Sequence, residues 1–131
     1  MARQSRVQLK RAYDPPSPRD GTRVLVDRLW PRGVRKTKAR IDLWLKDVAP
    51  STALRQWFGH EPARWSEFRR RYRAELKRQP EALTQLRTLA RQGRTTLVFG
   101  ARDERRNEAV VLKELLAGRS AKRARRAAPA R

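Results

Sequence analysis

The chain has 131 residues, which is the length of one domain with an ordinary hydrophobic core. It contains no cysteine and a single histidine, so disulfides, thiolate metal sites, a cysteine nucleophile and a multi-histidine metal site are excluded. No apolar run reaches the roughly 18 residues that a membrane span needs, and the N-terminus lacks the apolar segment of a secretory signal. We therefore expect a cytoplasmic protein that does not insert into a membrane.

The net charge of +21 is spread unevenly along the chain. Residues 1–11 carry four basic groups and residues 119–131 carry six, and neither segment contains an acid. A field of this sign attracts polyanions by counterion release and long-range steering. Nucleic acid or another polyanion is therefore the expected partner, and a coding bias toward arginine (27 arginines against 7 lysines) is the alternative explanation of the charge.

Strand and turn signals dominate the first third of the chain, and prolines and glycines separate them. The expected elements are strands at 7–13 and 22–27, a proline-rich turn at 14–18, a basic loop at 34–40 and a short helix at 41–48. Ser51 is the predicted N-cap of a further short helix that ends at Gly59.

The second half of the chain has clear helical periodicity. Trp65, Phe68, Tyr72 and Leu76 are spaced by three, four and four residues, which predicts the apolar face of a helix over 62–77. The elements expected after it are a helix from Pro80 to Gly93, a strand at 95–99 that is covered on both faces, and a final helix capped by Asp103 that ends before Gly118. Residues 1–118 would form the domain, and residues 119–131 a basic, disordered tail.

Strands that alternate with helices predict the α/β class: a single compact domain with a small, mainly parallel sheet flanked by helices. The connection between the first two strands is short, so an antiparallel hairpin at this point is the alternative.

Polar side chains follow two of the predicted strands. Ligands of open α/β sheets bind beyond the carboxyl ends of the strands, so parallel strands would bring these side chains to one edge. We predict an anion-binding cleft there, contacted by Arg28, Arg32 and Arg102. The alternative is that each acid of this region serves a local ion pair or helix cap. The full set consists of Asp27, Arg28, Arg32 and Gly33 after the second strand, and Arg102, Asp103 and Asn107 after the last.

An enzyme at the same cleft is the second hypothesis. Asp27 and Asp103 could hold Mg²⁺, or one of them could act as a base, with His60 as the acid. The alternative for His60 is a local hydrogen bond at a helix start. No Ser-His-Asp spacing, Walker A loop or Gly-x-Gly-x-x-Gly motif is present, which argues against nucleophilic hydrolysis and a mononucleotide P-loop, and no cofactor is predicted. A plain interaction module is the third hypothesis.

Seven of the nine aromatic residues lie between Trp30 and Tyr72. Aromatic side chains beside a basic groove hold single-stranded nucleic acids by stacking on the bases. Trp65, Phe68 and Tyr72 have the spacing of a helical core, which favours packing as their role. Trp30 lies in a loop, where it could stack on a ligand or plug the base of the sheet.

The segments that carry these candidate site and aromatic residues resemble the YeaO-like proteins, a bacterial family in the superfamily of domain of unknown function 488. The resemblance covers nearly all of residues 5–117, and its most specific run is Asp-Arg-Leu-Trp-Pro-Arg-Gly at 27–33. Further matches lie at 44–51, 54–60, 65–76 and 96–109. The resemblance implies a compact α/β fold with parallel strands, and it supplies no activity. The basic tail lies outside the shared region.

Overall fold

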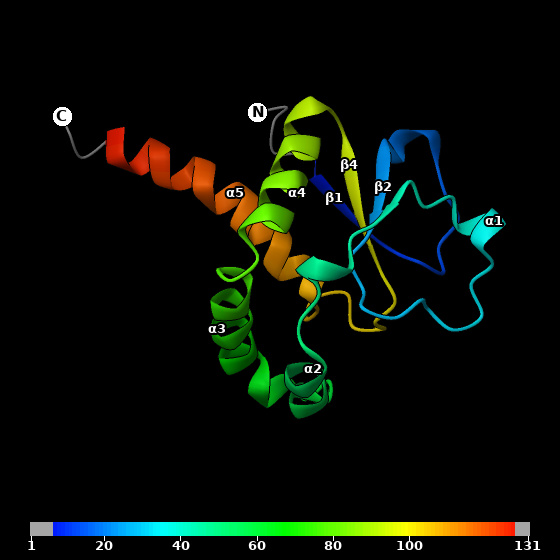
Figure 1. The fold of residues 1–131 in the computed structure, drawn as a ribbon, viewed down its shortest axis with the longest axis horizontal. Coiled ribbons are helices and arrows are strands. Elements are labelled where there is room, and N and C mark those ends of the chain that lie inside the picture. Colours follow the sequence, from blue (N-terminus) through cyan, green and yellow to red (C-terminus); the bar gives the residue numbers. More distant parts are fainter. Residues whose placement is uncertain (1–6, 128–131) are drawn as a thin grey trace.

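The computed structural model describes residues 7–127, and it describes the side chains of residues 7–117. Its centre is a four-stranded, all-parallel sheet with the strand order β1-β4-β2-β3 (Figure 1). The strands are β1 (Val7–Arg11), β2 (Thr22–Leu25), β3 (Leu43–Trp44) and β4 (Thr95–Phe99). Because β1 and β2 both pair with β4 and not with each other, the hairpin alternative is excluded. The predicted α/β class with a parallel sheet is confirmed.

Helices and short 3-10 turns occupy most of the remaining chain. The helices are α1 (Lys36–Ala39), α2 (Thr52–Phe58), α3 (Trp65–Leu76), α4 (Pro80–Gln92) and α5 (Glu108–Ala127). No helix in the part of the chain that the structure describes is long and apolar enough to cross a membrane.

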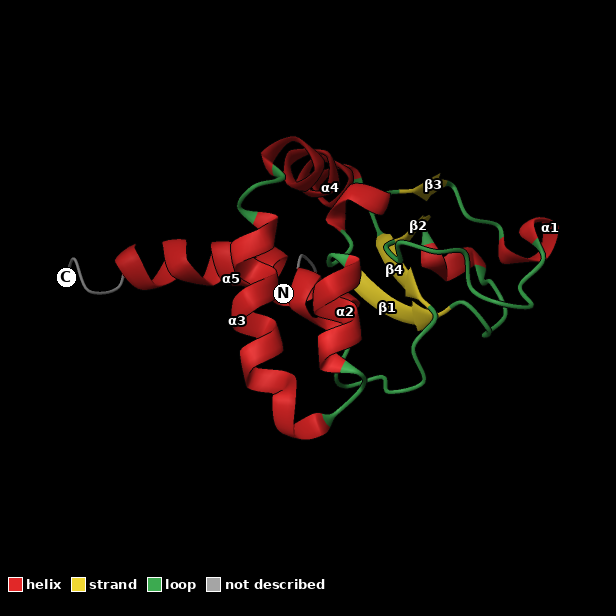
Figure 2. Cartoon of the chain, turned by 60° about the horizontal axis from the view of Figure 1, so that its bottom comes forward, coloured by secondary structure: helices red, strands yellow, loops and turns green. Residues whose placement is uncertain are grey.

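The two faces of the sheet are covered differently. Side chains alternate between the faces of a strand, so Val24 and Leu97 point into the large core formed with α2, α3, α4 and α5. Leu25 and Val98 point the other way, into a smaller cluster that Trp30 and neighbouring loop residues close. Figure 2 shows the long helices on one side of the sheet and mainly loops, with the short α1, on the other. Helices therefore flank one face, and loops cover the second.

The aromatic residues of α2 and α3 form the centre of the large core. Phe68 stacks on Phe58 with ring centroids 4.5 Å apart and on Trp65 with centroids 5.7 Å apart, and it contacts Tyr72 at 5.5 Å. Phe68 and Tyr72 are fully buried. The predicted helical face of residues 62–77 is confirmed as core, with a 3-10 turn (Pro62–Arg64) preceding α3.

The prediction of a helix at 41–48 is wrong. Residues 43 and 44 form β3, and a 3-10 turn (Lys46–Val48) follows. The backbone of this segment pairs with β2, because Asp42 N donates to Arg23 O and Leu45 N donates to Leu25 O, both at 2.9 Å. The free edge of β2 offers these carbonyls, and pairing with it outweighs the weak local helical pattern.

The last helix begins later and runs further than the sequence predicted. Its cap is Asn107, whose Oδ1 accepts from Val110 N at 3.1 Å, and Asp103 lies in the turn before it. The helix passes Gly118 and continues to Ala127, so residues 119–127 of the expected disordered tail are helical backbone in the structure. Residues 128–131 lie outside the described part of the chain.

Candidate anion-binding edge of the sheet

The carboxyl ends of β1, β4 and β2 lie together at one edge of the sheet, because all three strands are parallel. Three contacts tie the loops beyond these ends to one another. Arg11 Nε donates to Ala101 O at 3.0 Å, the Arg11 guanidinium lies 4.9 Å from the centre of the Tyr13 ring, and Tyr13 Oη donates to Arg32 O at 2.8 Å. We call Arg11, Tyr13, Arg32 and Arg102 the cationic edge.

The cationic edge presents its charges to solvent. Arg32 and Arg102 are exposed, Arg11 is half-buried, and the Tyr13 side chain is 48% exposed. No hydrogen bond or ion pair with another side chain engages Arg32 or Arg102 among residues 7–117. The structure therefore brings these two arginines, predicted from different parts of the sequence, to the same edge.

Asp27 lies beneath this edge, at the junction of β2 and β4. Gly100 N donates to Asp27 Oδ2 at 2.8 Å, which links the ends of the two strands. A Cβ at position 100 would lie 2.9 Å from Asp27 Oδ2 and 3.4 Å from Pro31 Cβ, so only glycine fits there without displacement. The other oxygen, Asp27 Oδ1, is buried and has no hydrogen-bond partner.

Glu108, the first residue of α5, supplies the missing partner. Its half-buried carboxyl group hydrogen-bonds to Asp27, and burial, this hydrogen bond and the charge of Asp27 together hold the pKa of Glu108 well above its usual value. A proton on Glu108 gives Asp27 the donor that it lacks. The raised pKa of Glu108 therefore favours its protonated form next to Asp27.

The buried Tyr72 lies near this carboxyl pair, and Ser51 and Glu75 are half-buried. Tyr72 Oη donates to Val48 O, and burial followed by the nearby charges of Glu108, Glu75 and Asp27 raises the pKa of the Tyr72 phenol. Ser51 N and Ser51 Oγ both donate to the Glu75 carboxylate, at 2.9 and 2.5 Å. These bonds hold the start of α2 against α3.

Sequence reasoning did not identify Glu108, Tyr72, Ser51 or Glu75 as site residues. Tyr72 was assigned to the core and Ser51 to a helix cap, and the structure confirms both of these contacts. Glu108 directly follows the predicted site residue Asn107, and this adjacency is the one feature of the local sequence that points to Glu108 as a site residue. Its partner Asp27 lies far away in sequence, so only the packing of α5 against the sheet joins them.

Arg28, Trp30 and Gly33 have local structural contacts. Arg28 donates from Nε to Pro50 O and from Nη2 to Ala49 O, each at 3.2 Å, which fixes the segment before α2. Trp30 Nε1 donates to Val34 O at 2.7 Å, and the Trp30 ring meets the Trp44 ring edge-on with centroids 5.4 Å apart. Gly33 has φ 79°, a left-handed conformation that favours glycine in this turn.

In the described part of the chain, the hydrogen bonds of Asp103 and Asn107 and the ring contact of His60 are with residues other than Asp27 and Glu108. Asp103 accepts from Arg105 N, Arg106 N and Arg106 Nη1 at 2.9 to 3.1 Å, and these bonds lower its pKa. Asn107 is buried, and its Nδ2 donates to Asp103 O at 2.8 Å. His60 is exposed at the end of α2, and its ring lies 6.1 Å from that of Phe58.

No hydrogen bond or ion pair among the described residues links Asp103 or His60 to Asp27. The same residues contain no group of three or more His, Cys, Asp or Glu side chains placed to hold a metal ion. A metal-binding or catalytic role for Asp27, Asp103 and His60 stays a prediction.

Comparison with known proteins identifies the family. A model described as the inactive DUF488-N3 subclade matches residues 6–131. The chain belongs to this family. It is 42% identical over 110 residues to the uncharacterized protein YeaO of Escherichia coli, covering 84% of this chain and 96% of YeaO. The predicted kinship with the YeaO-like proteins is thereby confirmed.

The chain is also similar to mycobacterial proteins. It is 47% identical over 119 residues to the uncharacterized proteins Rv3073c of Mycobacterium tuberculosis and Mb3100c of Mycobacterium bovis. These alignments cover 91% of this chain and all of each relative. No solved structure matches the chain.

Proposed function

We propose that the protein binds the phosphate backbone of nucleic acid through the cationic edge, and that it does so in the cytoplasm. The observation that carries this proposal is that hydrogen bonds tie together the loops that carry Arg11, Arg32 and Arg102 at the carboxyl ends of three parallel strands. Exposed guanidinium groups make strong, charge-assisted hydrogen bonds to phosphate oxygens. The edge is also where open α/β sheets place their ligands.

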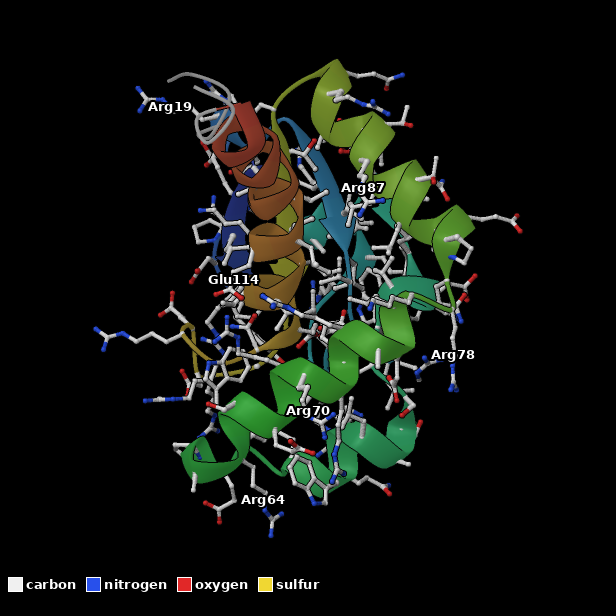
Figure 3. The ribbon with its side chains drawn as sticks, turned by 90° about the vertical axis from the view of Figure 1, so that its left-hand side faces the viewer. Arg19, Arg64, Arg70, Arg78, Arg87 and Glu114 are labelled. Carbon is white, nitrogen blue, oxygen red and sulfur yellow. The ribbon has the colours of Figure 1, made fainter. Side chains whose placement is uncertain are left out.

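The distribution of ion pairs supports an anionic partner. Several arginines on the helical side of the molecule are engaged in ion pairs: Arg70 and Arg71 pair with Glu67, and Arg69 and Arg73 pair with Glu114 (Figure 3 labels Arg70 and Glu114). At the cationic edge, in contrast, no ion pair among the described residues engages Arg11, Arg32 or Arg102. The charge of the edge is therefore left for a ligand.

The family description favours binding over catalysis, because it names an inactive subclade. A binding role also agrees with the contacts of the predicted catalytic residues. Asp103 is occupied by its own turn, and His60 lies beside Phe58. A domain that keeps a ligand-binding edge without a catalytic group is consistent with both observations.

Fluorescence anisotropy with a labelled oligonucleotide, repeated over a range of salt concentrations, tests this proposal. We expect affinity to fall steeply with salt, and the variant Arg32→Gln/Arg102→Gln to bind more weakly with a slope smaller by about 1.4 to 1.8, since each lost phosphate contact removes about 0.7 to 0.9. The control Lys77→Gln/Arg78→Gln removes the same charge from exposed positions between α3 and α4. Binding that does not depend on salt, or equal weakening in both variants, would contradict the proposal.

Acid–base catalysis is the second candidate function, and the carboxyl pair is the observation that favours it. A carboxylic acid kept protonated by burial and by a neighbouring carboxylate is suited to donate a proton to a substrate. Turnover of phosphate-containing substrates, with and without Mg²⁺, is the measurement to make on the wild type and on Asp27→Asn. A blank screen together with no Mg²⁺ binding by calorimetry would remove this candidate.

A further inference from the structure

An open groove adjoins the cationic edge, on the face of the sheet that the long helices leave uncovered. Its volume is about 1360 Å³. One wall is the loop at residues 12–18, and the other is the segment 33–42 that carries α1, on the right of Figure 1. Tyr13 lines the groove and also donates to Arg32 O, so the groove begins at the cationic edge.

The groove is lined by more cations than acids. Arg35, Lys38 and Arg40 are exposed on the wall that carries α1, and Arg23 lies below them in the lining. The acids of the lining are Asp14 and Asp42, and Asp42 already accepts from Arg23 N at 2.8 Å. The groove therefore has a net positive charge.

Arg23 is buried but incompletely paired. Its side chain is 4% exposed, its Nη1 donates to Asp20 at 2.6 Å, and its Nε donates to Ala39 O at 2.9 Å. Its Nη2 is buried and has no hydrogen-bond partner. A buried guanidinium nitrogen without an acceptor is costly, and an anion in the groove would reduce this cost by supplying one.

The charges around Arg23 also favour an anion in the groove. The Asp20 carboxylate, itself buried, also accepts from Lys10 Nζ at 2.9 Å. One acid thus serves two cations, so this buried network keeps an excess positive charge. That excess lies under a groove whose wall adds Arg35, Lys38 and Arg40.

We propose that this groove is the path of a single nucleic-acid strand, whose phosphates contact Arg35, Lys38 and Arg40 and reach toward Arg23. The inference rests on the proposed nucleic-acid binding at the cationic edge, and it extends that surface across the second face of the sheet. Proteins that hold single strands combine a positive groove along the backbone with aromatic rings on which bases stack. Tyr13, with its side chain 48% exposed at the mouth of the groove, provides such a ring.

The test measures binding of a labelled single-stranded oligonucleotide and of its duplex to the full chain. The groove variant Arg35→Gln/Lys38→Gln and the control Lys77→Gln/Arg78→Gln each replace one exposed arginine and one exposed lysine. We expect the groove variant to bind the single strand at least fivefold more weakly than the control does, with a salt slope smaller by about 1.4, at about 0.7 per phosphate. We expect the duplex to bind more weakly than the single strand to the wild type.

Tyr13→Ala and Tyr13→Phe test the stacking contact, because both lose the hydrogen bond to Arg32 O but only phenylalanine keeps the ring. We expect Tyr13→Ala to bind the single strand more weakly than Tyr13→Phe, with the same salt slope, because the two variants carry the same charge. Arg23→Lys keeps a cation beside Asp20 and removes Nη2, and it should weaken binding too. If Arg23→Lys fails to fold, the exposed groove variant still decides the outcome.

The results separate this inference from the function on which it rests. If Arg32→Gln/Arg102→Gln weakens binding and the groove variant behaves like its control, the groove path is overturned and the cationic edge stands. A wild type that prefers the duplex also overturns the single-strand path. If the wild type binds neither nucleic acid, the proposed function itself fails.

Discussion

Two acids flank β2, and their surroundings are opposite. Asp20, just before the strand, is buried between Lys10 and Arg23. Asp27, just after it, faces a second acid, Glu108. Burial by itself would raise the pKa of Asp20, but hydrogen bonds from Lys10, Ser17 N and Arg23 outweigh it and lower the pKa. The pKa of Glu108 is raised instead, by burial and by Asp27.

The difference separates a site that stabilises the fold from one that does not. The lowered pKa of Asp20 means that the native state favours its carboxylate, whereas the raised pKa of Glu108 means that the native state favours its protonated form. The protein therefore keeps an unfavourable arrangement at the carboxyl edge of its sheet. Perturbed ionisation of this kind concentrates at functional sites, which makes the Asp27 edge the better candidate of the two.

Asp20→Asn should cause the largest loss of stability. It would leave Lys10 and Arg23 without their shared counter-charge, and removing one partner of a buried ion pair costs about 3 kcal/mol or more. Urea unfolding at pH 7 measures the change in the free energy of unfolding. Asp14→Asn, at an exposed position of the neighbouring loop, should change it by less than about 0.5 kcal/mol. A loss below about 1 kcal/mol for Asp20→Asn would show that this network does not stabilise the fold.

Gly100→Ala should have the next largest effect, at the Asp27 end of the strand. The new Cβ would lie 2.9 Å from Asp27 Oδ2, so the carboxylate must move and its bond to Gly100 N weakens. Overpacking of this kind costs about 1 to 3 kcal/mol in unfolding experiments. Gly93→Ala is the matched control, because a Cβ there meets nothing within 4 Å. Equal stability of the two variants would contradict the close approach at Gly100.

Glu108→Gln should change the free energy of unfolding least, and it should raise the stability where the other two variants lower it. The folded-state pKa of Glu108 is raised, so its contribution to stability is complete below the usual value of 4.5 and is lost as pH rises through the folded pKa. A glutamine stays neutral and can still donate to Asp27. We expect the variant to be more stable than the wild type by about 1 kcal/mol at pH 8 and equally stable at pH 4.

The control for this measurement is Glu104→Gln, an exposed acid of the preceding turn. It should follow the wild type at every pH in a series of thermal or urea unfolding curves. For Asp20 the sign is reversed, because its stabilisation is present above the usual pKa of 3.8 and is lost as pH falls through the lowered value. A stability difference between Glu108→Gln and the wild type that is the same at pH 4 and pH 8 would contradict the raised pKa of Glu108.

Part of the candidate site could be predicted from the sequence. The positions of Asp27, Arg32 and Arg102 follow from two apolar strands that end in polar residues, together with the rule that parallel strands end at one edge. Glu108 could not be found in this way, since its role depends on where α5 packs. The unpaired Nη2 of Arg23 could not be predicted from the sequence either. Arg23 lies inside the predicted strand 22–27, and its hydrogen bonds to Asp20 and Ala39 depend on the tertiary structure.

The sequence by itself determined the α/β class, the helices α2, α3 and α4 and the buried strand β4. Their caps, periodicity and apolar runs are local, and the structure confirms their bounds to within three residues. Only the tertiary structure decided that residues 43 and 44 form a strand, that loops cover one face of the sheet, and that Asp27 meets Glu108. These features depend on contacts between segments that are distant in the chain, and local propensity carries no information about such contacts.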